Sequence, residues 1–404
     1  MELIENSRLT KRTKIALVSL ILCIFIPSYN YVLNEILQYD LGLGSISALS
    51  YIILAIVGLY SYTFLSKVNR TLFFLMGVVL IALFVSYLLY PEIKDAFISN
   101  DYNPLTSILL FIPLMGFPMM VYTNYLNKHL YYIVDYIRYP SLLLIILSIL
   151  DYYWTVLVNG HYFEVNYMSF SYFMLPGVCL SFYYGISKGK ILDSIISIIG
   201  LIVIFVTGSR GCFLCGVAFL ALACFKRYSL SVGKMFLFLL SIIAVIIVIS
   251  YFLPSFSDSV MTYMDEHGAT SRTLLKMSDG SIEESDSRNS IYKLMSKAVE
   301  ERPFGYGPMG DRYILHQHGN QGYAHSIIYE FLVDYGIILG PSLLLILAAS
   351  LCLKLKYFFK HDIYYIFAAF FALGLIKLFF SGSYLSEPFF WGLIGMLFIK
   401  KSKI

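Results

Sequence analysis

Runs of about 20 apolar residues recur along the 404-residue chain from Ile15 to Ile399, and they constrain its fold more than any other feature. Each run is long enough to cross a hydrocarbon core about 30 Å thick. Because lipid offers backbone groups no water to bond with, a spanning run must satisfy its own hydrogen bonds as a helix. Only 13% of the residues are charged, whereas soluble domains average about 25%. The sequence therefore predicts an all-α polytopic membrane protein.

The apolar runs predict about twelve transmembrane helices, over the approximate ranges 15–37, 43–65, 71–90, 105–126, 139–158, 169–187, 191–208, 211–225, 234–253, 326–353, 362–380 and 387–399. Most of the 29 lysines and arginines fall on the side of the N-terminus, whereas the short loops of the other side hold only Lys94 and Arg210. Since short cytoplasmic loops carry the excess of basic residues, both chain ends are predicted to be cytoplasmic. The expected parts are residues 1–253 with nine spans, a large periplasmic loop over 254–325, and residues 326–404 with three spans.

Composition excludes several other classes of protein. The basic residues sit mainly at helix ends and form no tract, so no nucleic-acid partner is expected. The six cysteines lie within or beside apolar runs, so the long loop has no disulfide framework. Cys212 and Cys215 form a lone CxxC, which we interpret as small residues of a spanning helix rather than a metal site. No small-residue cleavage site follows the first apolar run, so this run is expected to stay as an anchor.

Two polar segments interrupt the apolar pattern in an informative way. The seventh and eighth spans are expected to reverse at Gly208 to Gly211, which would leave Arg210 at the outer face. The alternative is one long helix through Arg210. In the long loop, residues 287–302 carry apolar side chains at helical spacing, which predicts an amphipathic helix lying against the bundle or along the outer interface. Pro303 and the glycine-rich FGYGPMG end this helix.

Three segments occur in a familiar order: Thr207-Gly-Ser-Arg-Gly211, the stretch from Ser287-Arg-Asn-Ser to Pro303-Phe-Gly-Tyr-Gly307, and the stretch from Tyr323-Ala-His-Ser to Gly336-Ile-Ile-Leu-Gly340. Together they resemble the O-antigen polymerase and O-antigen ligase superfamily. Its pattern joins a Ser/Thr-Arg turn, an Arg-led helix that runs into a Pro-(aromatic)-Gly-x-Gly turn, and a His before a Glu-bearing helix. The resemblance covers roughly residues 191–340. Ser326 stands where many members have Asn, which weakens any role for that side chain but not for His325.

The resemblance implies a GT-C-like glycosyltransferase of the bacterial inner membrane with its active site facing the periplasm. Such enzymes are inverting, need no metal or other cofactor, and act on undecaprenyl-pyrophosphate-linked oligosaccharides. A polymerase transfers the growing glycan onto a new lipid-linked repeat unit, whereas a ligase transfers it onto lipid A–core. Membrane lipids, a chain-length regulator and a flippase are the further partners that the family suggests.

The residue types suit this chemistry. Arginine makes bidentate, always charged contacts to phosphate oxygens, so Arg210 and Arg288 are the candidate pyrophosphate ligands. A histidine near neutrality can accept the proton of a sugar hydroxyl, and the helix start after His325 disfavours the charged imidazole. His325 is therefore the candidate catalytic base. The simpler interpretations are a snorkelling Arg210, a solvated Arg288 and a His325 that only caps its helix.

Several further residues are weaker candidates. Glu330, Tyr323, Tyr306 and Arg312 are assigned a supporting or sugar-binding role, although Glu330 could equally make an interhelical hydrogen bond. His316 and His318 lack further ligands and are interpreted as a solvated loop. Lys377 lies within a predicted span, which favours a structural ion pair or a cavity contact.

The Tyr-Ala-His-Ser-Ile-Ile-Tyr-Glu stretch favours a repeat-unit polymerase over a ligase. A flippase or transporter for lipid-linked oligosaccharides is the alternative from another class. It is disfavoured because nearly all charges fall at helix ends or in the long loop, whereas flippases place them along a central cavity.

Overall fold

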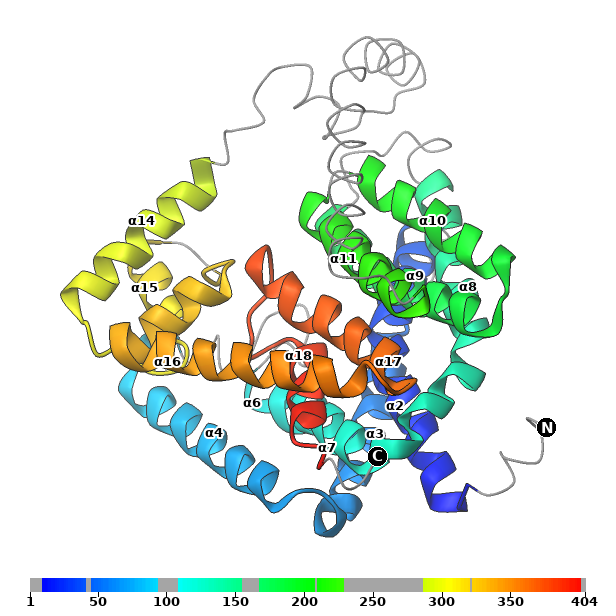
Figure 1. The fold of residues 1–404 in the computed structure, drawn as a ribbon. Coiled ribbons are helices and arrows are strands. Elements are labelled where there is room, and N and C mark those ends of the chain that lie inside the picture. Colours follow the sequence, from blue (N-terminus) through cyan, green and yellow to red (C-terminus); the bar gives the residue numbers. More distant parts are fainter. Residues whose placement is uncertain are drawn as a thin grey trace, which may run out of the picture. The chain divides into compact units, whose positions relative to one another are not determined.

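The computed structural model describes residues 9–40, 45–93, 108–154, 167–207, 209–228, 286–319 and 322–400, and within these ranges the chain is helical with no strand (Figure 1). Two compact units are distinguished. Unit 1 comprises Met1–Cys23, Tyr51–Tyr132 and Ser285–Ile404, and unit 2 comprises Ile24–Ser50 and Ile133–Glu284. Each unit is described by itself.

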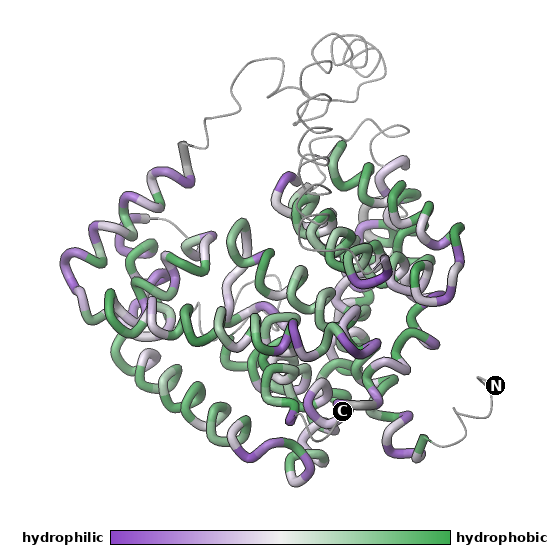
Figure 2. The backbone as a smooth tube through the Cα atoms, viewed as in Figure 1, coloured by the Kyte–Doolittle hydropathy of each residue, from purple (hydrophilic) through white to green (hydrophobic). Residues whose placement is uncertain are grey.

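Unit 1 holds most of the residues of interest. Its helices are α4 (Arg70–Leu89), α6 (Ile108–Phe111), α7 (Phe117–Leu126), α14 (Asp286–Glu301), α15 (Gly310–Gln317), α16 (Ile327–Phe358), α17 (Ile363–Phe370) and α18 (Pro388–Leu397). Its short 3-10 and π segments are η2 (Tyr62–Lys67), η3 (Pro91–Ile93), η5 (Ile112–Gly116), η6 (Asn127–Ile133), η10 (Phe371–Ile376) and η11 (Lys377–Phe379). Figure 2 shows that α4 and most of α16 are hydrophobic, whereas hydrophilic residues concentrate in α14.

Unit 2 is built around α9 (Tyr167–Lys188), which packs against three other helices: α8 (Val134–Tyr152), α10 (Ile191–Val206) and α11 (Arg210–Arg227). α2 (Lys11–Asn34), which η1 (Glu35–Asp40) follows, and α3 (Ser47–Ser61) each contribute residues to both units. Arg138, expected before its span, lies inside α8. Its guanidinium forms a bidentate pair with the buried Asp193, at 3.1 and 3.3 Å. The pair satisfies a charge that would otherwise be costly among apolar helices.

The membrane prediction is confirmed at a coarse level. Six helical segments in the described ranges are long and apolar enough to span, and three shorter apolar helices accompany them. The count of twelve stays a prediction, because the expected span 234–253 and the loop residues 254–285 lie outside the described ranges. α10 ends at Val206 and α11 begins at Arg210, so the alternative of one long helix through Arg210 is wrong.

α16 is broken at Gly336, whose φ of 77° and ψ of 178° no other residue adopts easily. The break frees backbone groups that the turn after α14 then satisfies. Ile337 N donates to Pro303 O at 2.9 Å, and Tyr306 N donates to Val333 O at 2.8 Å. The backbone groups at the break are thus hydrogen-bonded to the turn rather than left unpaired.

The turn can approach so closely because glycines meet at the contact. A Cβ added to Gly305 would lie 2.6 Å from both Asp334 O and Gly336 N, which is closer than atoms pack. Gly305 also has a φ of 86°. The Pro-Phe-Gly-Tyr-Gly motif and the Gly336 motif are therefore two halves of one contact. This contact fixes the start of α16, where the candidate site lies.

Candidate functional site

An apolar cluster joins α14, α15 and α16 beneath the site. Met295 and Ala298 of α14 are buried in it, and Ile291, Leu294 and Val299 pack at its edge. These five residues form the apolar face that the helical spacing of residues 287–302 predicts. Of the two expected positions for this amphipathic helix, the structure shows the first, because its apolar face packs on neighbouring helices.

Three buried carboxyl groups and one arginine lie on two of the same helices, α15 and α16. Asp311 and Arg312 open α15, and Arg312 Nη1 lies 3.4 Å from Asp311 Oδ1 and 3.8 Å from Glu330 Oε1. Burial lowers the pKa of Arg312, but the carboxyl groups of Asp311, Glu330 and Asp334 more than offset this and raise it above its ordinary value. Arg312 thus stays charged and pairs with buried carboxyl groups.

Glu330 and Asp334 also accept hydrogen bonds from the loop before α18 and from α15. Glu330 accepts from the Ser383 hydroxyl and, at 3.2 Å, from Tyr384 N. Asp334 accepts from Gly310 N at 3.0 Å and from the Tyr384 hydroxyl at 3.0 Å. Burial, followed by the nearby Tyr335 and carboxyl groups, raises the pKa of Tyr384 well above its ordinary value, so its phenol remains a donor. Glu330 thus links α16 to the loop before α18 rather than to another helix, and its supporting role at the site stays a prediction.

The loop that brings Ser383 and Tyr384 into the cluster is itself closed by an ion pair. Lys377 Nζ lies 2.5 Å from Glu387 Oε2, and Glu387 also caps α18 by accepting from Phe389 N. The pair confirms the structural interpretation of Lys377 as an ion-paired residue. Its effect is to hold the loop between η11 and α18 against the start of α16.

His325 stands directly before α16 in an unusual conformation. Its φ is 56°, in the left-handed region that non-glycine residues rarely adopt. The residue before it is fixed in place: Ala324 N donates to Asp311 Oδ2 at 2.9 Å, and Ala324 is fully buried. Ser326 makes no side-chain capping bond, in keeping with its doubtful role. The imidazole Nδ1 is buried and meets no hydrogen-bond partner among the residues described.

The surroundings keep His325 neutral. Burial lowers its pKa from the ordinary 6.5, the charge of Arg288 lowers it further, and Asp311 offsets part of the shift. The sequence also predicts a neutral imidazole, but it attributes this to the start of the following helix. In the structure the pKa is lowered by burial and by the charge of Arg288. Arg288 lies in the first turn of α14, and its charge acts on His325. A neutral imidazole near pH 7 can accept a proton.

The two candidate tyrosines differ in their surroundings. The Tyr323 ring lies 4.3 Å from the His325 ring, and its hydroxyl is 3.4 Å from Ser381 Oγ. Tyr306 belongs to the turn that covers the break in α16, and the Arg302 guanidinium lies 5.2 Å from its ring. Tyr323 thus lies beside the candidate base, whereas the backbone N–H of Tyr306 bonds to α16 at its break.

Arg210 belongs to unit 2, where it is exposed in the first turn of α11. The turn before it is anchored to α9. Thr207 Oγ1 lies 2.8 Å from Ser171 Oγ, and Cys212 Sγ donates to Ser171 O at 3.1 Å. The structure thus brings His325, Arg288 and Arg312 together in unit 1 and describes Arg210 separately. Cys212 and Cys215 are both buried in α11.

Sequence reasoning missed Asp311, Asp334 and Tyr384. Asp334 could have been identified from the sequence, since an acidic residue inside a predicted span is costly unless another group pairs with it. Asp311 and Tyr384 carried none, because their roles depend on contacts with residues distant in the sequence.

Comparison with known proteins agrees with the three motifs. A family model described as O-antigen ligase matches residues 195–344, a range that contains Arg210, Arg288 and His325. No curated protein and no solved structure matches the chain. The family is one of glycosyltransferase-type enzymes that polymerise or ligate O-antigen. The match is consistent with the O-antigen polymerase and ligase superfamily that the motifs of this part of the chain predict.

Proposed function

We propose that this protein is an O-antigen polymerase that joins undecaprenyl-pyrophosphate-linked repeat units at the periplasmic face of the bacterial inner membrane. The observation that carries the proposal is the state of His325. Its backbone is in a rarely adopted conformation, its Nδ1 is buried without a partner in the described ranges, and its pKa is lowered beside Arg288. Strained backbone and unpaired polar atoms of this kind are retained where function needs them.

The proposed reaction is a single inverting displacement. The acceptor hydroxyl attacks the anomeric carbon of the donor sugar while His325 takes the hydroxyl proton. The bond between that carbon and the pyrophosphate oxygen breaks, and the electron pair leaves with undecaprenyl pyrophosphate. Arg288 and Arg210 stabilise the negative charge that grows on the pyrophosphate, as preorganised cations can do without rearrangement. No metal is required for these steps, because the arginines supply the positive charge.

A matched pair of histidine variants tests the role of the base. His325→Ala should lower glycosyl transfer by about 10²- to 10⁴-fold, the range that general-base catalysis contributes. The assay uses full-length protein in proteoliposomes with lipid-linked repeat unit isolated from a strain that lacks this chain. His316→Ala is the control, because His316 is exposed at the end of α15. Transfer at the wild-type rate by well-expressed His325→Ala protein would exclude His325 as the base.

A ligase is the second candidate function, because the matching family model is described as O-antigen ligase. The lipopolysaccharide of a deletion strain separates the two. Loss of a polymerase leaves core that carries a single repeat unit. Loss of a ligase leaves bare core while lipid-linked polymer accumulates, and this result would overturn the polymerase proposal.

A further inference from the structure

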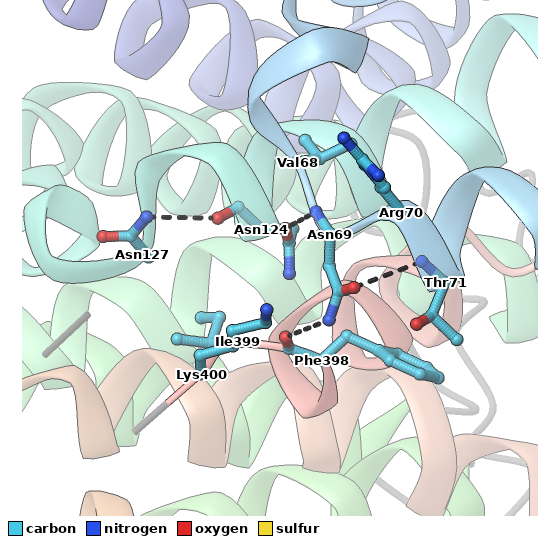
Figure 3. A pocket seen from close by; sticks show the side chains of 9 residues that line it. All are labelled: Val68, Asn69, Arg70, Thr71, Asn124, Asn127, Phe398, Ile399 and Lys400. Atoms are coloured by element: carbon cyan, nitrogen blue, oxygen red, sulfur yellow. Dashed lines mark hydrogen bonds between the residues drawn. The ribbon is translucent and has the colours of Figure 1, made fainter. Parts of the chain in front are cut away.

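A polar pocket of about 500 Å³ lies in unit 1, apart from the candidate catalytic residues (Figure 3). Three segments that the charge pattern predicts to be cytoplasmic form its walls. They are the junction before α4, the end of α7 and the residues after α18. The lining residues are Val68, Asn69, Arg70, Thr71, Asn124, Asn127, Phe398, Ile399 and Lys400.

Two asparagines hold the walls of the pocket together, as Figure 3 shows in part. Asn69 N donates to Asn124 Oδ1 at 3.0 Å, and Asn69 Nδ2 donates to Phe398 O at 3.2 Å. Asn124 is buried, and its Nδ2 donates to Gly395 O of α18 at 2.9 Å. Each of the three segments is thus bonded to another through a side-chain amide. The pocket is therefore preformed, as binding sites usually are.

The charge of the pocket is positive. Arg70 and Lys400 line it, and no lining residue is acidic. Neither cation has a carboxylate at ion-pair distance in the part of the chain that the structure describes. A pocket lined by a guanidinium group, an ammonium group and no carboxylate suits a phosphate, which arginine binds through two parallel hydrogen bonds.

α4 exposes apolar side chains over much of its surface, and one stripe of them runs from the pocket along the helix. Phe74, Val78, Ile81 and Val85 follow Arg70 at helical spacing, and all four are exposed, Phe74 by 72% and Ile81 by 67%. From Phe74 to Val85 the helix rises by about 16 Å, which is close to half of a hydrocarbon core about 30 Å thick. A phosphate pocket that adjoins one leaflet's length of apolar surface matches a phospholipid better than a soluble phosphate.

We propose that this pocket binds the phosphate headgroup of an anionic phospholipid, with Arg70 and Lys400 as its cationic contacts and the α4 stripe beside its acyl chains. Basic pockets between membrane helices on the cytoplasmic side bind lipid headgroups in this way. The site is independent of the glycosyl transfer proposed above, because none of its residues belongs to the cluster around His325.

The test measures lipid affinity of the full-length purified protein by native mass spectrometry with phosphatidylglycerol, phosphatidylcholine and inorganic phosphate as probes. The double variant Arg70→Gln/Lys400→Gln should bind phosphatidylglycerol on the order of 30-fold more weakly, since each cation near the surface contributes about a factor of five. Lys226→Gln/Arg227→Gln is the matched control, because it removes one lysine and one arginine at the end of α11. This control and the charge-retaining Arg70→Lys/Lys400→Arg variant should bind as the wild type does.

Three outcomes would overturn the proposal. Equal affinity of the double variant and the control would show that the pocket is not the lipid site. Equal affinity of the wild type for phosphatidylcholine and phosphatidylglycerol would remove the requirement for an anionic lipid. Displacement of phosphatidylglycerol by millimolar inorganic phosphate would identify a soluble phosphate as the ligand. Should the double variant fail to fold, the single variant Lys400→Gln carries the same comparison with Lys226→Gln, with about a fivefold loss expected.

Discussion

At the scale of single residues, Asp311 is the side chain through which the protein positions His325. Its Oδ2 accepts from Ala324 N and so fixes the peptide between Tyr323 and Ala324, directly before the left-handed His325. A left-handed backbone costs about 1–2 kcal/mol in a non-glycine residue, and this cost persists only where neighbouring contacts impose the conformation. Asp311 is fully buried and also pairs with Arg312. The charged network thus acts on His325 through its backbone.

Opposite shifts of the pH profile are expected when the two charges near His325 are removed. The base is active when neutral, so transfer falls as pH drops through the pKa of His325, which lies below 6.5. Asp311→Asn removes a charge that raises this pKa, so the acid limb of kcat/KM should move to lower pH. Arg288→Gln removes a charge that lowers it, so the limb should move to higher pH.

The Asn side chain in the Asp311→Asn variant can still accept from Ala324 N, so the backbone contact is retained and the charge is what changes. A purely structural role would lower kcat/KM at every pH without moving the limb. Limbs that stay in place in both variants would show that another group titrates.

The sequence identifies the site residues that stand in local motifs but not those that depend on contacts between distant segments. His325 and Arg288 stand in local motifs, so their residue types and spacing alone make them candidates. Asp311 acts on Ala324, 13 positions away, and Asp334 bonds with Tyr384, 50 positions away. Pairings of this kind depend on the packing of α15, α16 and the loop before α18. No local pattern encodes that packing.

At the scale of elements, the break in α16 and the turn after α14 form one structural unit. α14 was predicted within a residue at each end, because helical spacing of apolar residues is a local signal. The contact between Gly305 and Gly336 was not predicted, although both glycines stood in recognised motifs. A glycine pattern shows that close approach is needed, but it does not name the partner.

Gly336→Ala should weaken this contact and destabilise the start of α16. The alanine would be strained at a φ of 77°, and its Cβ would lie 2.5 Å from Phe304 C. We expect a loss of about 2–4 kcal/mol from strain and overpacking together. The readouts are the thermal unfolding temperature of the full-length protein and the rate of proteolysis at the turn after α14.

Gly319→Ala separates the two causes, because Gly319 has a φ of 72° and nothing within 4 Å of an added Cβ. It should cost about 1 kcal/mol, since only backbone strain applies. Equal effects of the two substitutions would show that close approach at Gly336 contributes nothing.

At the scale of the whole molecule, the contacts in unit 1 group the loops by predicted side of the membrane. The Tyr90 ring stacks 4.4 Å from the Tyr313 ring, and Tyr323 lies beside Ser381, so segments predicted to be periplasmic meet one another. The segments predicted to be cytoplasmic meet in the pocket beside Arg70. This grouping is what a regular alternation of spans requires. The charge pattern alone assigns which group faces the cytoplasm.

The sequence motifs predict that Arg210 and Arg288 both contact the donor pyrophosphate. If both guanidinium groups bind the same pyrophosphate, their effects on the transition state must be coupled. We expect Arg210→Gln and Arg288→Gln each to lower kcat/KM by about 10²-fold, the loss that removal of one preorganised donor causes. The double variant should then lose much less than the product of the two factors, because the second arginine contributes little once the shared charge is no longer clamped.

The measurement is a double-mutant cycle on kcat/KM for the full-length protein in proteoliposomes. Arg227→Gln is the control partner, because Arg227 lies at the opposite end of α11 from Arg210. Its effect should multiply with that of Arg288→Gln, as independent sites do. If the effects of Arg210→Gln and Arg288→Gln on kcat/KM also multiply, the two arginines act independently and do not bind the same pyrophosphate. Arg288 and His325 would then form a site within unit 1 alone.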